Sequence, residues 1–69
     1  MDKQNAKVLA WLQHWPSITP FEAYDQLRVY RLGARIFDLR ERGHDILNTE
    51  PLGKPARYVL VKLAGGDNA

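Results

Sequence analysis

The sequence predicts an α+β fold in which three helices are followed by a C-terminal β-hairpin. Three observations predict it: apolar residues at helical spacing in two segments, a capping motif that begins a short helix between them, and two strand-like runs around a loop rich in Pro and Gly. With 69 residues the chain is long enough for one small domain. We expect this domain to span residues 1–63, and residues 64–69 to form a flexible polar tail.

The first helix is predicted over residues 3–15, where the apolar residues recur at helical spacing. Pro16 ends it, because the proline ring removes a backbone donor and biases the preceding residue away from the helical region. Trp11 and Trp15 lie four residues apart, so we expect both in the core or along one hydrophobic edge of this helix. The alternative for an exposed Trp is a dimer contact.

The second helix is predicted from Pro20 to about Leu27. Thr19 is followed by Pro at the first helical position and by Glu22 three residues later, which is the pattern of a capping box. Ile18, directly before the cap, can pack against Ala23 as the hydrophobic staple that often accompanies a capping box. We expect this helix to bury Phe21 or Tyr24 together with Ala23 and Leu27.

The third helix is predicted from Arg31 to Arg42. Leu32, Ile36 and Leu39 form one apolar stripe on it, and Gly43 directly after it is a signal for the helix end. The other side of the helix is predicted to be outward-facing, and it carries Arg31, Ala34, Phe37, Asp38 and Glu41.

The connection at residues 28–30 is too short for anything but a tight turn, so the second and third helices must be consecutive and steeply angled, as in a helix-turn-helix. After Gly43, residues 45–50 and 57–63 are β-branched or aromatic runs on either side of a loop that contains Pro51, Gly53 and Pro55. Three helices followed by such a hairpin make a winged helix, with its wing at about residues 51–57.

Two segments resemble the small winged helix-turn-helix domain of many phage and prophage proteins. They are Ser17-Ile18-Thr19-Pro20-Phe21-Glu22-Ala23 and the run from Arg31 through Arg40 to Gly43. The resemblance covers about residues 6–60 and implies a winged helix that binds DNA. The chain departs from the family pattern at Trp15-Pro16 and at Tyr30, which replaces the usual small hydroxyl cap of the third helix, so that cap is expected to be weak.

The charge distribution agrees with a nucleic-acid partner. The formal net charge is only +2, yet residues 28–42 hold five Arg against two acidic residues. We expect the third helix to enter a major groove, where Arg31 can contact a guanine edge and Ala34 or Phe37 can meet thymine methyl groups. The residues predicted to contact DNA are Arg28, Tyr30, Arg31, Gly33, Ala34, Arg35, Phe37, Arg40, Lys54 and Arg57.

Some of these residues also have a structural interpretation. Arg35 and Asp38 are spaced for an ion pair within the helix, and Gly33 is explained either by close approach of DNA or by packing against the second helix. Asp38 and Glu41 on the outer face would mark where contact with the DNA backbone stops, because carboxylates repel phosphates. Lys54 and Arg57 are the wing candidates, with a solvated charged loop as the alternative.

The sequence gives no sign of an enzyme or of a cofactor. It contains no Cys, its two His residues have no metal-ligand spacing, and no serine lies in a nucleophile motif. We therefore expect no catalytic residue, no metal site and no cofactor. No segment is long and apolar enough for a membrane span or a signal peptide, so a cytoplasmic protein is expected.

The predicted function is binding to double-stranded DNA, as a small phage-type transcriptional regulator or an excisionase-like architectural factor. One such module contacts few base pairs, so a homodimer or a cooperative oligomer on DNA is a further expectation. The alternative function is a winged-helix interaction module or inhibitor that binds a protein partner through Phe37, Asp38 and Glu41.

Overall fold

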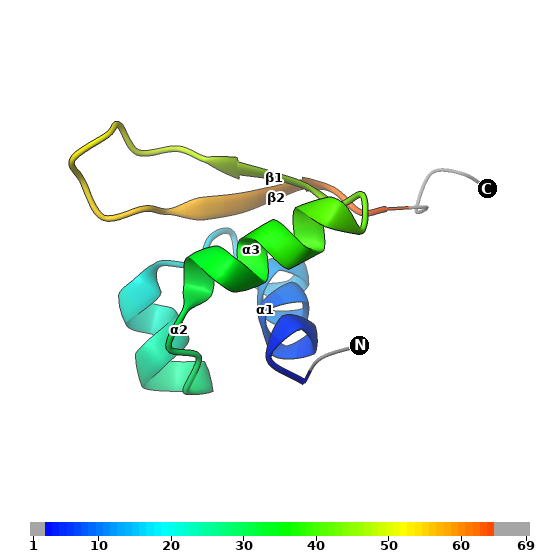
Figure 1. Cartoon of the computed structure of the whole chain (residues 1–69), viewed down its shortest axis with the longest axis horizontal. Coiled ribbons are helices and arrows are strands. Elements are labelled where there is room, and N and C mark those ends of the chain that lie inside the picture. The colour runs from blue at the N-terminus through cyan, green and yellow to red at the C-terminus, as the bar shows by residue number, and fades with distance from the viewer. Residues whose placement is uncertain (1–2, 65–69) are drawn as a thin grey trace.

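The structure is a computed structural model that describes residues 3–64, and it has the predicted α+β fold (Figure 1). Three helices are followed by two antiparallel strands. The bounds of the elements are α1 Lys3–His14, α2 Pro20–Leu27, α3 Leu32–Glu41, β1 Asp45–Asn48 and β2 Tyr58–Lys62. Of the tail predicted at residues 64–69, only Ala64 lies within the described part of the chain.

The capping box of α2 is confirmed in both directions. The Thr19 hydroxyl accepts a hydrogen bond from the Glu22 backbone N–H at 3.2 Å, and the Thr19 N–H donates to the Glu22 carboxylate at 2.9 Å. Both ends of the motif are therefore satisfied, which fixes where the chain enters α2. The helix ends at Arg28, which adopts a left-handed conformation with φ 58°.

The bounds of α3 are one residue shorter at each end than predicted, and Arg31 rather than Tyr30 occupies the N-cap. Arg31 makes no side-chain capping hydrogen bond. The N-terminal cap of α3 is therefore weak, as expected, although the capping residue is Arg31 and not Tyr30. The C-terminal end is closed more firmly. Gly43 has φ 98°, its N–H donates to Arg40 at 2.9 Å, and the His44 N–H donates to Leu39 at 3.2 Å, which together form a Schellman motif.

The hairpin pairs Ile46 with Leu60 and Asn48 with Tyr58, so the strands are shorter than the runs that predicted them. Residues 49–57 form the wing loop. A third segment joins the sheet at a single residue pair, because Ile18 and Tyr58 exchange both backbone hydrogen bonds at 2.9 Å. The extended piece between α1 and α2 is thereby tied to the hairpin, a pairing that the sequence did not predict.

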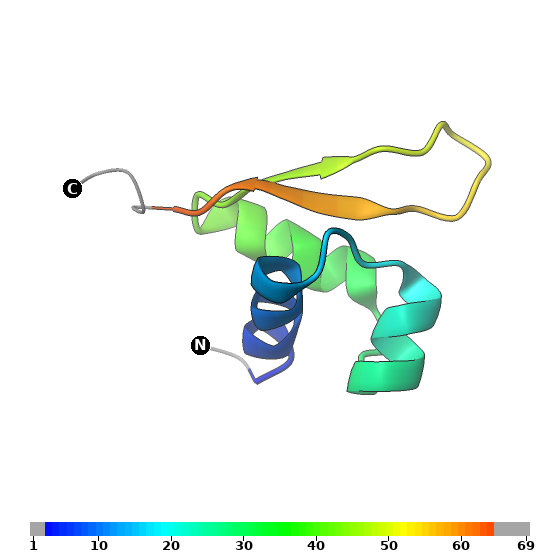
Figure 2. The ribbon, with the colours of Figure 1, turned by 180° about the vertical axis from the view of Figure 1, so that it is seen from behind.

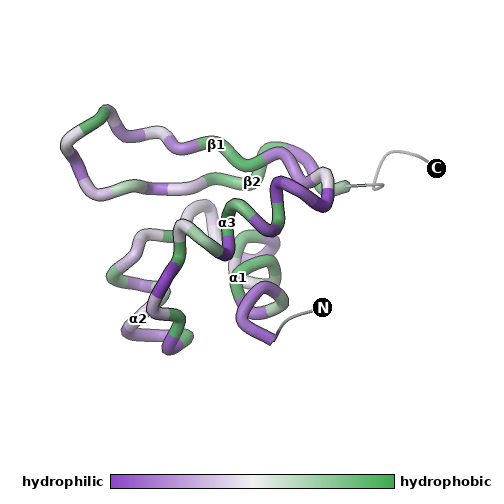
Figure 3. Tube along the Cα trace, viewed as in Figure 1, coloured by the Kyte–Doolittle hydropathy of each residue, from purple (hydrophilic) through white to green (hydrophobic). Residues whose placement is uncertain are grey.

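The core lies where α1, α2, α3 and the inner face of the hairpin meet (Figure 2). Buried side chains from the three helices, from β1 and from the connections on either side of α2 fill it: Val8, Leu12, Ile18, Ala23, Val29, Leu32, Ile36, Leu39 and Ile46. Tyr58 and Leu60 of β2 pack against this core. The predicted stripe of α3 is confirmed as its central part. Figure 3 shows that hydrophilic residues interrupt the apolar ones along α3, as expected for a helix with one buried side.

The aromatic residues are less buried than predicted. The expectation that α2 buries Phe21 or Tyr24 is wrong, since these side chains are 73% and 49% exposed. Ala23 and Leu27 occupy the inner side of this short helix, and Phe21 lies two residues from Ala23, on the opposite side. Trp11 packs against the core and donates to the Ser17 carbonyl at 2.7 Å, whereas Trp15 remains half exposed.

Candidate nucleic-acid interface

The outward side of α3 is uncovered along its length. α3 lies in front of α1 in Figure 1 and behind it in Figure 2, so its side away from α1 faces the viewer in Figure 1. Gly33, Phe37 and Glu41 are exposed on this side, with Ala34 half-buried between them. Leu32, Ile36 and Leu39 are buried on the opposite side. The helix is therefore divided, as its apolar spacing predicted.

Gly33 has no structural neighbour that explains a glycine. A Cβ placed on it would meet no other atom within 4 Å. The alternative expectation that Gly33 packs against the second helix is therefore wrong. Glycine in a helix interior costs up to about 1 kcal/mol relative to Ala; at Gly33, the second residue of α3, no packing contact within the described residues accounts for the choice of glycine.

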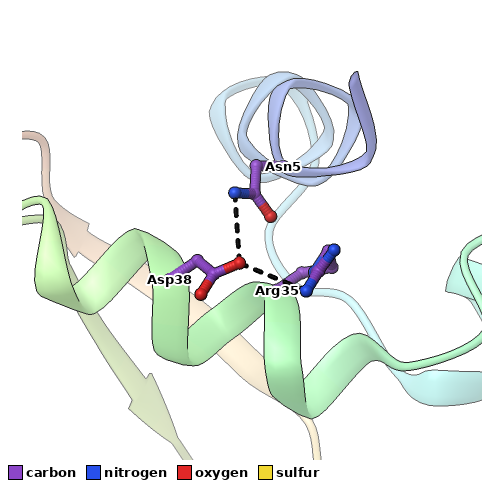
Figure 4. A network of polar contacts seen from close by, with 3 residues as sticks. All are labelled: Asn5, Arg35 and Asp38. Atoms are coloured by element: carbon purple, nitrogen blue, oxygen red, sulfur yellow. Dashed lines mark hydrogen bonds and ion pairs between the residues drawn. The ribbon is translucent and has the colours of Figure 1, made fainter. Parts of the chain in front are cut away.

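Asp38 does not lie on the outer face, contrary to the prediction. Its carboxylate accepts from the Asn5 side-chain amide of α1 at 3.3 Å and pairs with the Arg35 guanidinium at 3.2 Å (Figure 4). Position 38 lies at the boundary between the buried and outward sides of the helix, and the nearly buried Asn5 draws its side chain toward α1. The intrahelical pair predicted for Arg35 and Asp38 is confirmed.

Arg40 also makes contacts within the fold. Its Nε and Nη2 donate to the Ile46 carbonyl at 3.0 and 2.8 Å, and its guanidinium lies 5.9 Å from the centre of the Tyr58 ring. These contacts join the end of α3 to both strands. Two of the arginines predicted to contact DNA, Arg35 and Arg40, thus have partners inside the molecule.

The turn between α2 and α3 gathers two exposed tyrosines and a cation. The Arg28 guanidinium lies 5.9 Å from the Tyr24 ring centre, and the Tyr24 and Tyr30 rings are 5.2 Å apart. Arg31 follows at the start of α3 and is exposed, with no hydrogen bond or ion pair from its side chain to residues 3–64. Tyr24 was not predicted to take part in the site, although it lies four residues before Arg28, the residue that caps the C-terminal end of α2.

The wing loop presents Lys54 to solvent, while Arg57 at its base is also exposed but has a hydrogen-bond partner. The Lys54 backbone N–H donates to the Pro51 carbonyl at 3.2 Å, which closes the turn at the tip. The Arg57 guanidinium donates to the Ser17 hydroxyl at 3.1 Å. Ser17 was not predicted to take part in the site, and its role follows from the pairing of residue 18 with the hairpin.

The predicted residues fall into two groups in space. The wing loop, α2 and the N-terminal end of α3 project toward the same end of the molecule in both views (Figures 1 and 2). The wing loop, which contains Lys54 and Arg57, lies above α3 at this end in Figure 1, and the α2–α3 turn, which contains Arg28, Tyr30 and Arg31, lies below it. Arg35 and Arg40 lie apart from them, turned toward α1 and toward the strands respectively.

The described part of the chain offers no enclosed site. Residues 3–64 form no pocket and hold no group of three or more His, Asp or Glu side chains arranged for a metal ion. Within the same residues, no helix has the length and apolar character needed to cross a bilayer.

Comparison with known proteins agrees with this geometry. A family model described as a winged helix-turn-helix domain matches residues 3–62. No curated protein and no solved structure matches the chain.

Proposed function

The chain belongs to the winged helix-turn-helix family, whose domains typically bind DNA, and from this premise we propose that the outward side of α3 enters the major groove of duplex DNA. The observation that carries the proposal is the uncovered outer side of α3 beside Arg31. Because the Arg31 side chain has no partner among residues 3–64, it is available to contact a guanine edge in a bidentate manner.

The electrostatics of this end of the molecule support an anionic partner. Residues 28–37 contain three arginines and no acidic residue. The carboxylate nearest to them on α3, that of Asp38, is turned toward Asn5 and Arg35. The phosphate backbone supplies much of the affinity of DNA-binding proteins, and here it would meet cations without an opposing carboxylate on the first turns of α3.

The wing and the turn would contact the backbone on either side of the helix. Lys54 at the tip and Arg28 in the turn each present a charge to solvent at the end of the molecule where α3 begins. Arg57, which is fixed by Ser17, would contact a phosphate nearer the body of the domain. Phosphate contacts of this kind position a protein on the duplex but carry no sequence information.

The biological role we propose is that of a small transcriptional regulator or an excisionase-like architectural factor of phage or prophage type, acting in the cytoplasm. One module of this size contacts only a few base pairs, so binding to a specific site would use a homodimer or cooperative neighbours on DNA. A second candidate, a protein-interaction module, is favoured by the exposure of Phe37 and Glu41, but Asp38 is turned away from that surface.

A salt titration against mixed-sequence duplex DNA tests the proposal. The association constant is measured by fluorescence anisotropy at several salt concentrations. We expect its logarithm to fall linearly with the logarithm of the salt concentration, with a slope of about −0.9 per phosphate contacted. Lys54→Ala should lower that slope by about one contact and weaken all sequences alike, whereas Arg31→Ala should weaken a selected site by about 1–3 kcal/mol more than random DNA.

The matched control is Lys3→Ala, which removes an exposed positive charge at the start of α1, outside the proposed interface. It should leave the salt slope nearly unchanged. Absence of binding at low salt would contradict the DNA proposal and favour the protein-partner alternative. Equal losses for Arg31→Ala and Lys54→Ala on all sequences would contradict the separate roles given to these residues.

A further inference from the structure

The part of α3 that would face the bases carries no hydrogen-bonding side chain for more than a full helical turn. We define the apolar strip as Gly33, Ala34 and Phe37, which share the outward side of the helix. Phe37 is 60% exposed although it lies one residue from the buried Ile36. Glu41, one turn further along, ends the strip.

The dimensions of the strip match a short run of base pairs. At a rise of about 1.5 Å per residue, Gly33 and Phe37 are separated by about 6 Å along the helix axis. Bases on one DNA strand are separated by about 3.4 Å along the duplex, so the strip spans about two base-pair steps. Gly33 allows the closest approach, because a side chain at this position would project into open space rather than against the fold.

The chemistry of the strip selects one kind of group in the major groove. Base edges there present hydrogen-bond donors and acceptors, and the only apolar group is the C5-methyl of thymine. A helix face of glycine, alanine and phenylalanine cannot satisfy donors or acceptors, but it can bury methyl groups. Arg28 and Arg31 lie on the N-terminal side of the strip, which anchors an anionic duplex beside it.

Building on the proposed function, we propose that α3 recognises the 5-methyl groups of adjacent pyrimidines. Its DNA partner is therefore a site with neighbouring thymines facing Ala34 and Phe37. Arg31 reads a flanking guanine edge where the site has one, as proposed above, and the apolar strip discriminates pyrimidines that carry a 5-methyl group from those that do not.

Duplexes that differ only in the methyl group test this proposal. The probes are 20-bp alternating A·T duplexes with thymine or with uracil, and alternating G·C duplexes with cytosine or 5-methylcytosine, all compared at one low salt concentration. The hydrogen-bonding edges of each pair of probes are identical. We expect the uracil duplex to bind about fourfold more weakly per methyl contacted, and 5-methylcytosine to strengthen binding by a similar factor.

Two variants assign the effect to α3. Phe37→Ala should remove most of the difference between the thymine and uracil duplexes, and it should fold normally because the side chain is largely exposed. Its matched control, Arg31→Ala, should weaken both duplexes while keeping their affinity ratio. A circular dichroism melt of each variant confirms that the fold is retained.

Equal binding of the thymine and uracil duplexes by the unmodified protein would overturn the inference while leaving DNA binding itself intact. A methyl preference that survives in Phe37→Ala would likewise overturn the assignment to the apolar strip. Failure to bind any of the four duplexes would instead contradict the proposed function on which this inference rests.

Discussion

The two sides of α3 differ in how their polar side chains are used. On the side toward α1, Asp38 pairs with Arg35 and accepts a hydrogen bond from Asn5. On the other flank, Arg40 donates two hydrogen bonds to the Ile46 carbonyl. On the outward side, the first turns carry only Gly33, Ala34 and Phe37. A count of arginines in the sequence therefore overstates the charge available to a partner, because two of those in or beside α3 serve the fold.

The difference also separates stability from recognition. The inner side contributes buried area and hydrogen bonds to α1 and β1, and the outward side of the first turns contributes neither. Substitutions on the two sides should consequently have opposite signatures: a loss of stability on one, and a loss of DNA binding with little change in stability on the other.

The largest expected difference is between two neighbouring apolar positions. Leu39 is completely buried among core residues, so Leu39→Ala should lower the free energy of unfolding by about 2–5 kcal/mol through lost burial and the cavity it leaves. Phe37→Ala should change it by no more than about 0.5 kcal/mol, because its side chain is 60% exposed. Urea unfolding followed by circular dichroism measures both values.

Equal destabilisation by the two substitutions would mean that Phe37 packs against the fold in solution. The comparison between the two sides of α3 would then fail.

A smaller effect is expected from the polar contacts toward α1. Asp38→Ala removes the acceptor for the nearly buried Asn5 amide, and it should lower the free energy of unfolding by roughly 1 kcal/mol. This loss of stability is at the low end of the range for leaving a buried donor without its acceptor, because the Asp38 side chain is 39% exposed and solvent weakens its interactions. The same urea titration measures it.

The matched control is Glu41→Ala, which removes an exposed carboxylate from the outward side of the same helix. It should leave stability nearly unchanged and strengthen DNA binding slightly by removing a repulsive charge. If Glu41→Ala destabilised the fold more than Asp38→Ala, the assignment of these two carboxylates to different sides would be wrong.

Local signals predicted the elements well. The capping box at Thr19, the glycine at position 43 and the stripe of Leu32, Ile36 and Leu39 each depend on residues within a few positions of one another, and each is confirmed. The spacing of Pro and Gly in the wing likewise predicted the hairpin.

Contacts between distant segments could not be predicted in this way. The pairing of Ile18 with Tyr58 and the bond from Asn5 to Asp38 join residues 40 and 33 positions apart, and no local pattern contains them. The same limit explains the error at Asp38. A side chain at the boundary between two faces of a helix can turn toward either face, and the hydrogen bond from Asn5 of α1 turns the Asp38 side chain inward.

The exposure of the aromatic residues was also missed for a physical reason. An aromatic side chain on a short helix is ordinarily expected to be buried, but the inner side of α2 is filled by Ala23 and Leu27. Phe21 and Tyr24 are left on the outside, close in sequence to Arg28. The position of Tyr24 against Arg28 and Tyr30 could be seen only after the side that α2 buries was known.

Binding of DNA to the outward side of α3 is tested most directly by a map of backbone amide shifts in the ¹⁵N-labelled protein during titration with duplex DNA. We expect the largest changes at Arg31, Gly33, Ala34 and Phe37, with smaller changes at Lys54 in the wing. The amides of the exposed side of α1, at Ala6, Ala10 and Gln13, should remain nearly unchanged. Changes concentrated on α1 or on the outer face of the hairpin, with the outward side of α3 unaffected, would contradict this mode of binding.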